Sequence, residues 1–133
     1  MKNNLEKRRC HRFQIPGAYV RYQRGGVWKM ISHLSPRKEL ANISKGGLCF
    51  DDDEKLNLGD KVTVYLYLPH GPSLSIKGSV VWKGGSEYTG YSIGVQFAAY
   101  KNGFGYNPME VLDAMRTLEA IYSDHCDEVR RVA

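Results

Sequence analysis

One stretch of seven residues decides the fold class of this chain: Val62-Thr63-Val64-Tyr65-Leu66-Tyr67-Leu68. Aliphatic residues occupy every second position, and threonine or tyrosine stands between them. Successive side chains of a β-strand point to opposite faces, so this alternation predicts a strand that turns its aliphatic face towards a hydrophobic core. β-Branched and aromatic residues also favour strands, which supports the same assignment.

Short apolar segments of the same kind lie on both sides of this strand, with turn residues between them. We expect a hairpin turn at Arg24-Gly25-Gly26, a connection over residues 34–39 and a hairpin connection at Gly84-Gly85. About six or seven strands, spaced roughly 8 to 12 residues apart with no helix between them, indicate an antiparallel β-barrel or a sandwich. A barrel would leave no strand edge exposed. The other predicted strands cover residues 18–22, 27–31, 48–50, 74–83 and 88–97.

The pattern changes to a helical period after residue 106. Asn107 is a suitable N-cap, Pro108 suits the first helical position, and Glu110 stands three residues after the cap. We therefore predict an amphipathic helix over residues 107–123 that packs on the barrel, although its apolar stripe would also suit a partner protein. A polar tail follows at residues 124–133. The stripe consists of Val111, Leu112, Met115, Leu118 and Tyr122.

Length and composition fit one domain with an ordinary core, since the chain has 133 residues and is 42% hydrophobic. No apolar run is long enough to span a bilayer, and no secretory signal begins the chain, so we expect a cytoplasmic protein without membrane insertion. The formal net charge is +5. Most of this net charge comes from residues 1–12, which contain five basic residues and one acidic residue. These residues are expected to form a flexible basic arm, and residues 13–106 the barrel.

Residue types that carry catalysis or bind metals are scattered. The three cysteines, Cys10, Cys49 and Cys126, are odd in number and lack close spacing, which argues against a disulfide framework and a zinc site. We interpret Cys49 as a buried strand residue, and Asp51-Asp52-Asp53-Glu54 as a solvated acidic turn without calcium-loop spacing. The four histidines form no set with a nucleophile or a carboxylate. We expect neither an enzyme nor a metalloprotein.

A candidate ligand site combines two short segments. In Asn42-x-Ser44 two polar side chains lie two residues apart and would share one face of an extended chain. Gly46-Gly47 would allow a turn with positive φ and bring a ligand close to bare backbone. The cluster Arg8-Arg9-Cys10-His11-Arg12 supplies guanidinium groups, which suit a compact anion with a polar heterocycle. Alone, the first segment also fits an ordinary turn and the second a solvated tail.

Together, Arg8-x-x-x-Arg12 and Asn42-x-Ser44-x-x-Gly47 resemble the two-part motif of the PilZ domain, a bacterial receptor module for cyclic di-GMP. The resemblance extends over roughly residues 6–100 and includes Leu58-Gly59-Asp60-Lys61-Val62, Gly78-Ser79-Val80-Val81-Trp82 and Ile93-Gly94-Val95-Gln96-Phe97. The position of Asn42 is Asp in many members of the family, so this chain keeps an acceptor oxygen there but lacks the carboxylate. The resemblance implies a PilZ-like barrel with cyclic di-GMP as its ligand, and no other cofactor.

The resemblance also implies roles for individual residues. Arg8 and Arg12 would bind phosphate and stack on guanine with help from Arg9, while Asn42 and Ser44 would bind the ligand from the barrel. Gly46 and Gly47 would leave room for it, and Trp82 would lie beside a guanine or, alternatively, in the core. Lys7, the basic residue before the first arginine, implies a stacked pair of ligand molecules.

The implied mechanism is closure of the basic arm over the ligand, which changes the surface that an effector protein contacts. Control of motility, surface polysaccharide and biofilm formation are expectations from the family. Two other functions remain open: a PilZ-like adaptor that binds proteins without the nucleotide, and a small barrel that binds single-stranded nucleic acid.

Overall fold

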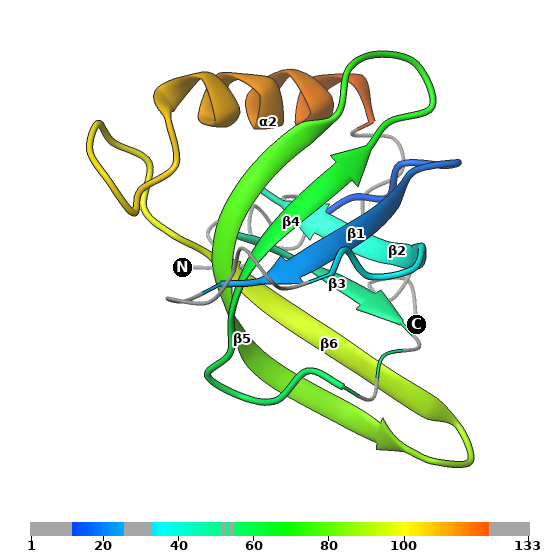
Figure 1. Ribbon diagram of the computed structural model, residues 1–133. Helices are drawn as coiled ribbons and strands as arrows, with labels where there is room; N and C mark the ends of the chain where they lie inside the picture. Colours follow the sequence, from blue (N-terminus) through cyan, green and yellow to red (C-terminus); the bar gives the residue numbers. More distant parts are fainter. Residues whose placement is uncertain (1–11, 26–32, 52, 54, 123–133) are drawn as a thin grey trace, which may run out of the picture.

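The fold is a closed β-barrel of six antiparallel strands with a helix after the last strand (Figure 1). The computed structural model describes residues 12–25, 33–51, 53 and 55–122. Around the barrel the strand order is β1-β2-β3-β6-β5-β4, and β4 pairs with β1 to close it. The predicted all-β barrel is thereby confirmed. The strands are β1 (Tyr19–Arg24), β2 (Lys38–Ser44), β3 (Gly47–Asp51), β4 (Lys61–Tyr67), β5 (Leu74–Ser86) and β6 (Gly90–Phe97).

Strand β4 has the predicted alternation. Val62, Val64 and Leu66 are buried, and the residues between them lie on the outer side. The same alternation in the other strands fills the barrel with apolar side chains, because each strand points one face inwards and the other outwards. The core therefore lies inside the barrel, and residues available to ligands lie on its outside.

Several strand boundaries differ from the prediction, and the clearest cases are the start of β2 and the turn between β5 and β6. Strand β2 begins at Lys38, so residues 38 and 39 belong to the strand rather than to the connection. The pair Gly84-Gly85 does not form the turn, because both residues pair with β6. The turn falls at residues 87–89 instead, where Ser86 Oγ accepts hydrogen bonds from the backbone N–H groups of Tyr88 and Thr89. The predicted strand 27–31 lies outside the described residues.

Helix α2 (Met109–Ile121) packs its apolar stripe on the barrel, and Val111, Met115 and Leu118 are buried. The predicted cap at Asn107 is wrong, because the N-cap residue is Pro108 and no side chain caps the helix. Asn107 is fully buried and uses its side chain to join the helix start to the barrel. Its Oδ1 accepts a hydrogen bond from Lys77 N at 2.8 Å, and its Nδ2 donates to Lys77 O and Ala98 O at 3.0 Å each. Among the described residues no helix is long and apolar enough to cross a membrane.

The predicted solvated acidic turn is wrong for Asp53, whose side chain is buried. It accepts hydrogen bonds from the Tyr22 hydroxyl and from the backbone N–H groups of Lys55 and Leu56, and Lys38 Nζ lies 3.5 Å away. Burial alone would raise the pKa of Asp53, but these hydrogen bonds and the lysine charge outweigh it and leave the pKa below its ordinary value. Sequence reasoning missed this site because Tyr22 and Lys38 reach Asp53 only in the folded chain.

We predict that protonation of Asp53 contributes to acid unfolding. Because its pKa is lower in the folded chain, the stabilisation is complete above the unfolded value of about 3.9 and is lost as the pH falls through the folded value. Urea unfolding of Asp53→Asn should therefore lose less stability between about pH 5 and pH 3 than the wild type does. The exposed Asp113→Asn serves as control and should keep the wild-type pH dependence. Identical profiles for Asp53→Asn and wild type would contradict this role.

The Asn107 contacts give a second prediction. Asn107→Ala leaves the N–H of Lys77 and the carbonyl oxygen of Ala98 without their Asn107 partner and removes one of two hydrogen bonds to Lys77 O, so urea denaturation should show that the free energy of unfolding falls by about 2 to 4 kcal/mol. Asn102→Ala, the same substitution at an exposed loop position, should change stability by less than about 0.5 kcal/mol. Equal effects of the two substitutions would mean that Asn107 does not hold the helix to the barrel.

Candidate functional site

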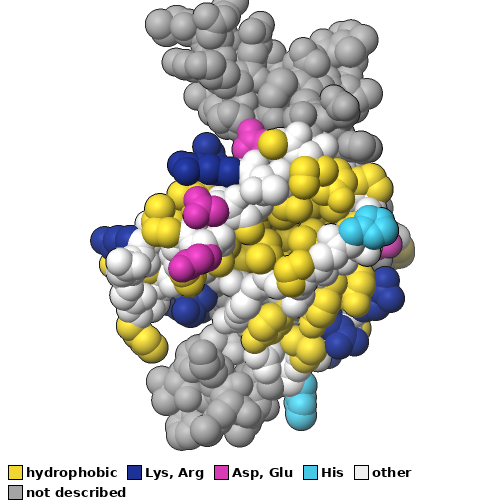
Figure 2. Space-filling model, turned by 90° about the horizontal axis from the view of Figure 1, so that it is seen from above, with side chains coloured by type: hydrophobic (Ala, Val, Ile, Leu, Met, Phe, Trp, Pro, Cys, Tyr) yellow, Lys and Arg dark blue, Asp and Glu magenta, His cyan; other side chains and the backbone are white. Residues whose placement is uncertain are grey.

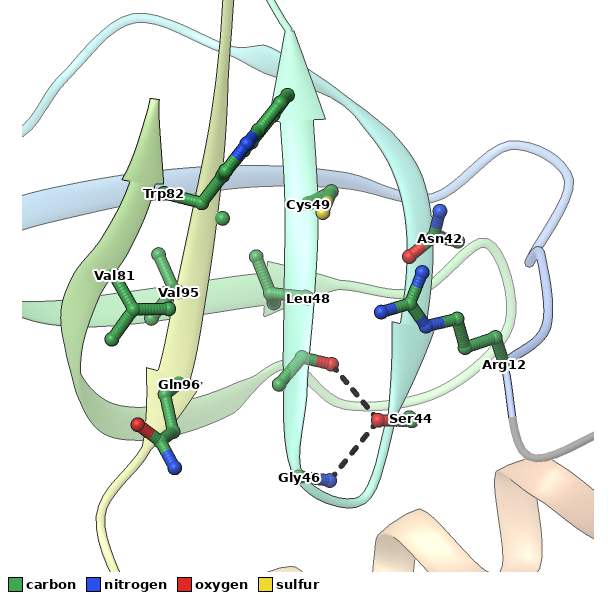
Figure 3. A pocket seen from close by; sticks show the side chains of 12 residues that line it. Arg12, Asn42, Ser44, Gly46, Leu48, Cys49, Val81, Trp82, Val95 and Gln96 are labelled. Carbon is green, nitrogen blue, oxygen red and sulfur yellow. Dashed lines mark hydrogen bonds between the residues drawn. The ribbon is translucent and has the colours of Figure 1, made fainter. Parts of the chain in front are cut away.

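A pocket of about 650 Å³ lies on the outer surface of the barrel (Figure 3). Four neighbouring strands, β2, β3, β6 and β5, supply its residues, and the segment before β1 adds an arginine. The volume is that of a site for a small ligand rather than for a large polymer. The lining residues are Arg12, Asn42, Ser44, Gly46, Gly47, Leu48, Cys49, Val81, Trp82, Gly94, Val95 and Gln96.

Strand pairing places the polar and the aromatic residues in two rows. One row crosses all four strands, with Asn42 opposite Cys49, Cys49 opposite Gly94, and Gly94 opposite Trp82. Directly paired residues point to the same side of a sheet, so this row faces outwards. The second row contains Ser44, Gly47 and Gln96.

The middle of the first row rises less above the sheet than its ends do, because Gly94 has no side chain and Cys49 has a small one. The pocket therefore has a flat floor at Cys49 and Gly94, with the Asn42 amide at one end and the Trp82 indole at the other (Figure 3). A planar group could lie on this floor against the backbone.

A β-bulge places Trp82 on the outside. Val80 pairs with Val95 and Trp82 pairs with Gly94, so β5 has one extra residue, Val81, at this point. As a result Val81 and Trp82 are 53% and 51% exposed, whereas Val80 is buried. The alternative that Trp82 is a core residue is wrong. Gly84 leaves space for the indole ring, since a Cβ there would lie 2.6 Å from it.

Arg12 is held beside the same strands by its neighbour. Phe13 is completely buried and exchanges two backbone hydrogen bonds of 2.9 Å with Ile43, between Asn42 and Ser44. The Arg12 guanidinium lies next to Asn42 and points across β2 towards β3 (Figure 3). The structure thus brings one arginine of the sequence motif to the polar pair. The other basic residues of the predicted site, Lys7, Arg8 and Arg9, lie outside the described residues.

The turn between β2 and β3 uses Ser44 as well. Ser44 Oγ accepts a hydrogen bond from Gly46 N at 3.2 Å and donates to Gly47 O at 3.5 Å. This is the local bonding expected of an ordinary turn. Ser44 therefore forms part of an ordinary turn and also lines the pocket.

The two glycines of this turn do not have the positive φ that was predicted. Gly47 is required by strand packing, because a Cβ at this position would overlap the backbone carbonyl oxygen of Val95 in β6. Gly46 is open, and the nearest atom to a Cβ there would be Ser44 Oγ at 3.8 Å. Gly47 is thus a structural requirement of the barrel, whereas Gly46 exposes backbone at the edge of the pocket.

The end of β6 and the segment after it hold the β2–β3 turn in place through two hydrogen bonds. Tyr100 donates a hydrogen bond from its hydroxyl to Lys45 O at 2.5 Å, and Phe97 N donates to Gly46 O at 2.9 Å. Burial raises the pKa of Tyr100 to about 12, so the hydroxyl remains a donor at neutral pH. Sequence reasoning did not identify Tyr100. It also missed Gln96, although the alternation of Val95, Gln96 and Phe97 already indicates that Gln96 points outwards.

Cys49 is not the buried core residue that was predicted. It is half-buried on the outer face, at the floor of the pocket, while its neighbours Leu48 and Phe50 point inwards. Burial raises the pKa of the Cys49 thiol, and Asp51 adds to this effect, whereas the charge of Arg12 opposes it. A thiol with a raised pKa is a weak nucleophile, so Cys49 contributes shape to the pocket rather than reactivity.

Comparison with protein families agrees with this geometry. The family model of the PilZ domain matches residues 6–102, which is most of the chain. The chain belongs to the PilZ domain family. The match includes the PilZ arginine motif as well as the barrel segment from Asn42 to Gly47. No curated protein shows significant similarity to this PilZ domain.

The two glycines of the turn give a matched pair of substitutions. Gly47→Ala should lower the free energy of unfolding by about 1 to 3 kcal/mol or more, because β3 and β6 must move apart to admit the methyl group. Gly46→Ala should change it by less than about 0.5 kcal/mol. Chemical denaturation of both variants tests this difference, and a tolerated Gly47→Ala would show that the strands can separate there without cost.

Proposed function

We propose that this PilZ protein is a cytoplasmic receptor for cyclic di-GMP, and that the pocket on β2, β3, β6 and β5 is its binding site. The observation that carries the proposal is the position of Arg12. The backbone bridge between Phe13 and Ile43 holds this arginine beside Asn42 and Ser44, so residues from the two halves of the PilZ motif line one pocket. Membership of the family supports the same ligand class, since PilZ domains are cyclic di-GMP receptors.

Each residue of the site has a role that its chemistry supports. The planar guanidinium of Arg12 can bind a phosphate through two hydrogen bonds or stack on a base, which a lysine does not reproduce. Arg8 takes the same role from the other end of the motif, with Arg9 as a helper. Arg8 and Arg12 are four positions apart in the sequence, so covalent geometry limits the distance between their Cα atoms to about 14 Å.

The barrel supplies the hydrogen-bonding side of the site. Asn42 and Ser44 offer an amide and a hydroxyl from adjacent rows, and they bind a guanine edge and a phosphate. Gly46 lets the ligand approach the turn, and Gly47 keeps this turn close to β6. A guanine lies on the floor formed by Cys49 and Gly94, with Trp82 along its side. The Trp82 indole is half-exposed and on the outside of the barrel, as this contact requires.

The basic arm closes over the bound ligand. Charge-assisted hydrogen bonds contribute about 1.5 to 3 kcal/mol each and a stacked base about 1 to 3 kcal/mol. Ordering a residue of the arm costs up to about 1 to 2 kcal/mol, so much of this gain is offset. The resulting affinity is micromolar to submicromolar, and closure changes the surface that an effector protein meets.

Titration calorimetry with cyclic di-GMP, GTP and a short single-stranded oligonucleotide tests the proposal. Cyclic di-GMP should bind selectively, and Arg12→Ala should weaken it at least tenfold, because a charge-assisted contact is lost. Arg116→Ala removes an exposed arginine from α2 and should leave the affinity unchanged. Preferential binding of the oligonucleotide would instead support a nucleic-acid barrel. The face that carries α2 gives no such indication, since its basic and acidic side chains are interspersed (Figure 2).

The same titration measures the number of ligands. Lys7, before the first arginine of the motif, leads us to propose a stacked pair of cyclic di-GMP molecules, and two ligands should bind per chain. A ratio of one would reject the stacked pair while leaving the receptor function in place. Absence of any heat or thermal stabilisation with cyclic di-GMP would reject the receptor and favour a protein-binding adaptor.

A further inference from the structure

A second surface of the barrel carries tyrosines and arginines that the ligand pocket does not use. We call it the β1/β4 face, because its residues lie at the outward positions of these two strands. The two strands lie side by side in the barrel (Figure 1). Tyr19 lies opposite Tyr67, Arg21 opposite Tyr65, and Gln23 opposite Thr63. Arg37, just before β2, adds an exposed guanidinium at one edge. Tyrosine and arginine are enriched in the contact residues of protein interfaces, whereas most of an ordinary surface lacks such a cluster.

Three of these side chains form a layered stack across the strands. The Tyr19 and Tyr67 rings are 4.8 Å apart and nearly parallel at 13°. The guanidinium carbon of Arg37 lies 3.8 Å from the centre of the Tyr19 ring. Paired strands are about 4.8 Å apart, so rings stacked at this distance stand upright on the sheet and present their edges. The face is therefore ordered in advance, and little side-chain entropy remains to be lost on binding.

The charge of this face is positive. Arg21, Lys61 and Lys77 lie at outward positions of β1, β4 and β5, and Arg37 lies at the edge. Glu39, opposite Tyr19, is an acidic residue among them, and Asp60, next to Lys61, forms an ion pair with Arg24. Within the described part of the chain, the buried Nε of Arg21 has no hydrogen-bond partner. Burial of this N–H without a partner costs free energy. A carboxylate that binds the other nitrogens of the Arg21 guanidinium would offset this cost, so we expect Arg21 to favour an acidic partner.

Barrel closure puts this face away from the ligand pocket. In the order β1-β2-β3-β6-β5-β4, the seam between β1 and β4 is diametrically opposite the seam between β3 and β6. The pocket floor, at Cys49 and Gly94, lies on the β3/β6 seam. A protein bound to the β1/β4 face would therefore leave the pocket accessible.

We propose that the β1/β4 face binds an extended acidic segment of a partner protein. Tyr19 and Arg21 are two residues apart on β1, so their rows are about 7 Å apart. Carboxylates at alternate positions of an extended peptide have the same spacing and meet Arg37 and Arg21 in turn. The tyrosine edges pack beside the peptide backbone. The Tyr65 hydroxyl donates a hydrogen bond of 3.0 Å to Gln23, which links the middle of this face to the row of Gln23 and Thr63.

The stack favours a peptide over a nucleic acid. Single-stranded nucleic acids bind by stacking their bases on open aromatic faces. Here Arg37 covers one face of Tyr19 and Tyr67 covers the other, so that ring has no open face for a base. For Tyr19 only the ring edge remains, next to the Arg37 guanidinium, and this combination suits a carboxylate.

An NMR titration of the full ¹⁵N-labelled chain tests the proposal. The probes are a twelve-residue peptide of alternating glutamate and serine, its neutral glutamine–serine analogue, and a single-stranded thymidine oligonucleotide of twelve nucleotides. The acidic peptide should shift the amide signals of Tyr19, Arg21, Tyr65 and Tyr67, and the neutral peptide should not. Arg21→Gln with Arg37→Gln should weaken the acidic peptide at least fivefold.

Lys101→Gln is the matched control, because Lys101 also lies over a tyrosine, at 4.5 Å from the ring of Tyr106, but outside this face. It should change the affinity less than twofold. If the double variant does not fold, the exposed Arg37→Gln alone should still weaken the peptide. Signals that shift only outside the β1/β4 face, equal loss with Lys101→Gln, or tighter binding of the oligonucleotide to this face would each overturn the proposal.

Discussion

Closure of the barrel is the constraint on which the rest of this structure depends. Once β4 pairs with β1, every strand has two neighbours, and each has one face in the core and one face in solvent. Where the described strands are paired on both sides, no strand edge is left for a ligand or a partner to extend. Functional groups must therefore be placed on the outer face, where adjacent strands bring outward residues into rows. The ligand pocket and the β1/β4 face are two such sets of rows on opposite sides of one core.

The rows explain why a shallow outer surface can hold a small ligand. A flat sheet face rarely has depth, but small residues in the middle of a row lower the floor while larger ones remain at its ends. Cys49 and Gly94 have this middle position, and Asn42 and Trp82 have the ends. The hydrogen bonds from Tyr100 and Phe97 keep the β2–β3 turn at the edge of this floor. The shape of the pocket thus comes from backbone pairing more than from side-chain conformation.

Much of this was predictable where the signal is local. The alternation of residues 62–68 predicts strand β4, and the two-residue separation of Asn42 and Ser44 predicts their common face. Contacts between distant segments were not predictable. Asn107 stands at a position typical of a helix cap, but its side-chain amide instead bonds three backbone groups, two of Lys77 in β5 and one of Ala98 after β6. In the sequence, Asp53 looks like part of a solvated acidic segment, and only the fold brings Tyr22 and Lys38 into contact with it.

The glycines of the β2–β3 turn also depend on contacts with distant segments that the sequence does not reveal. A Gly-Gly pair normally suggests freedom of φ, yet Gly47 is needed because Val95 of β6 lies against it, a contact that the sequence around Gly47 cannot reveal. Trp82 was ambiguous for a related reason. A single extra residue shifts the alternation of β5, and a bulge has no reliable signature in one sequence.

The bulge at Val81 separates the lining of the pocket from the packing of the core, two properties that a mutation in a strand usually changes together. Residues before it, such as Val80, remain in register with the interior, while the extra residue places both Val81 and Trp82 outside. Substitution at these two exposed positions can alter the size and polarity of the pocket without removing an interior contact. Sequence change at these two positions therefore reshapes the pocket at little risk to folding, a form of evolvability that comes from one inserted residue.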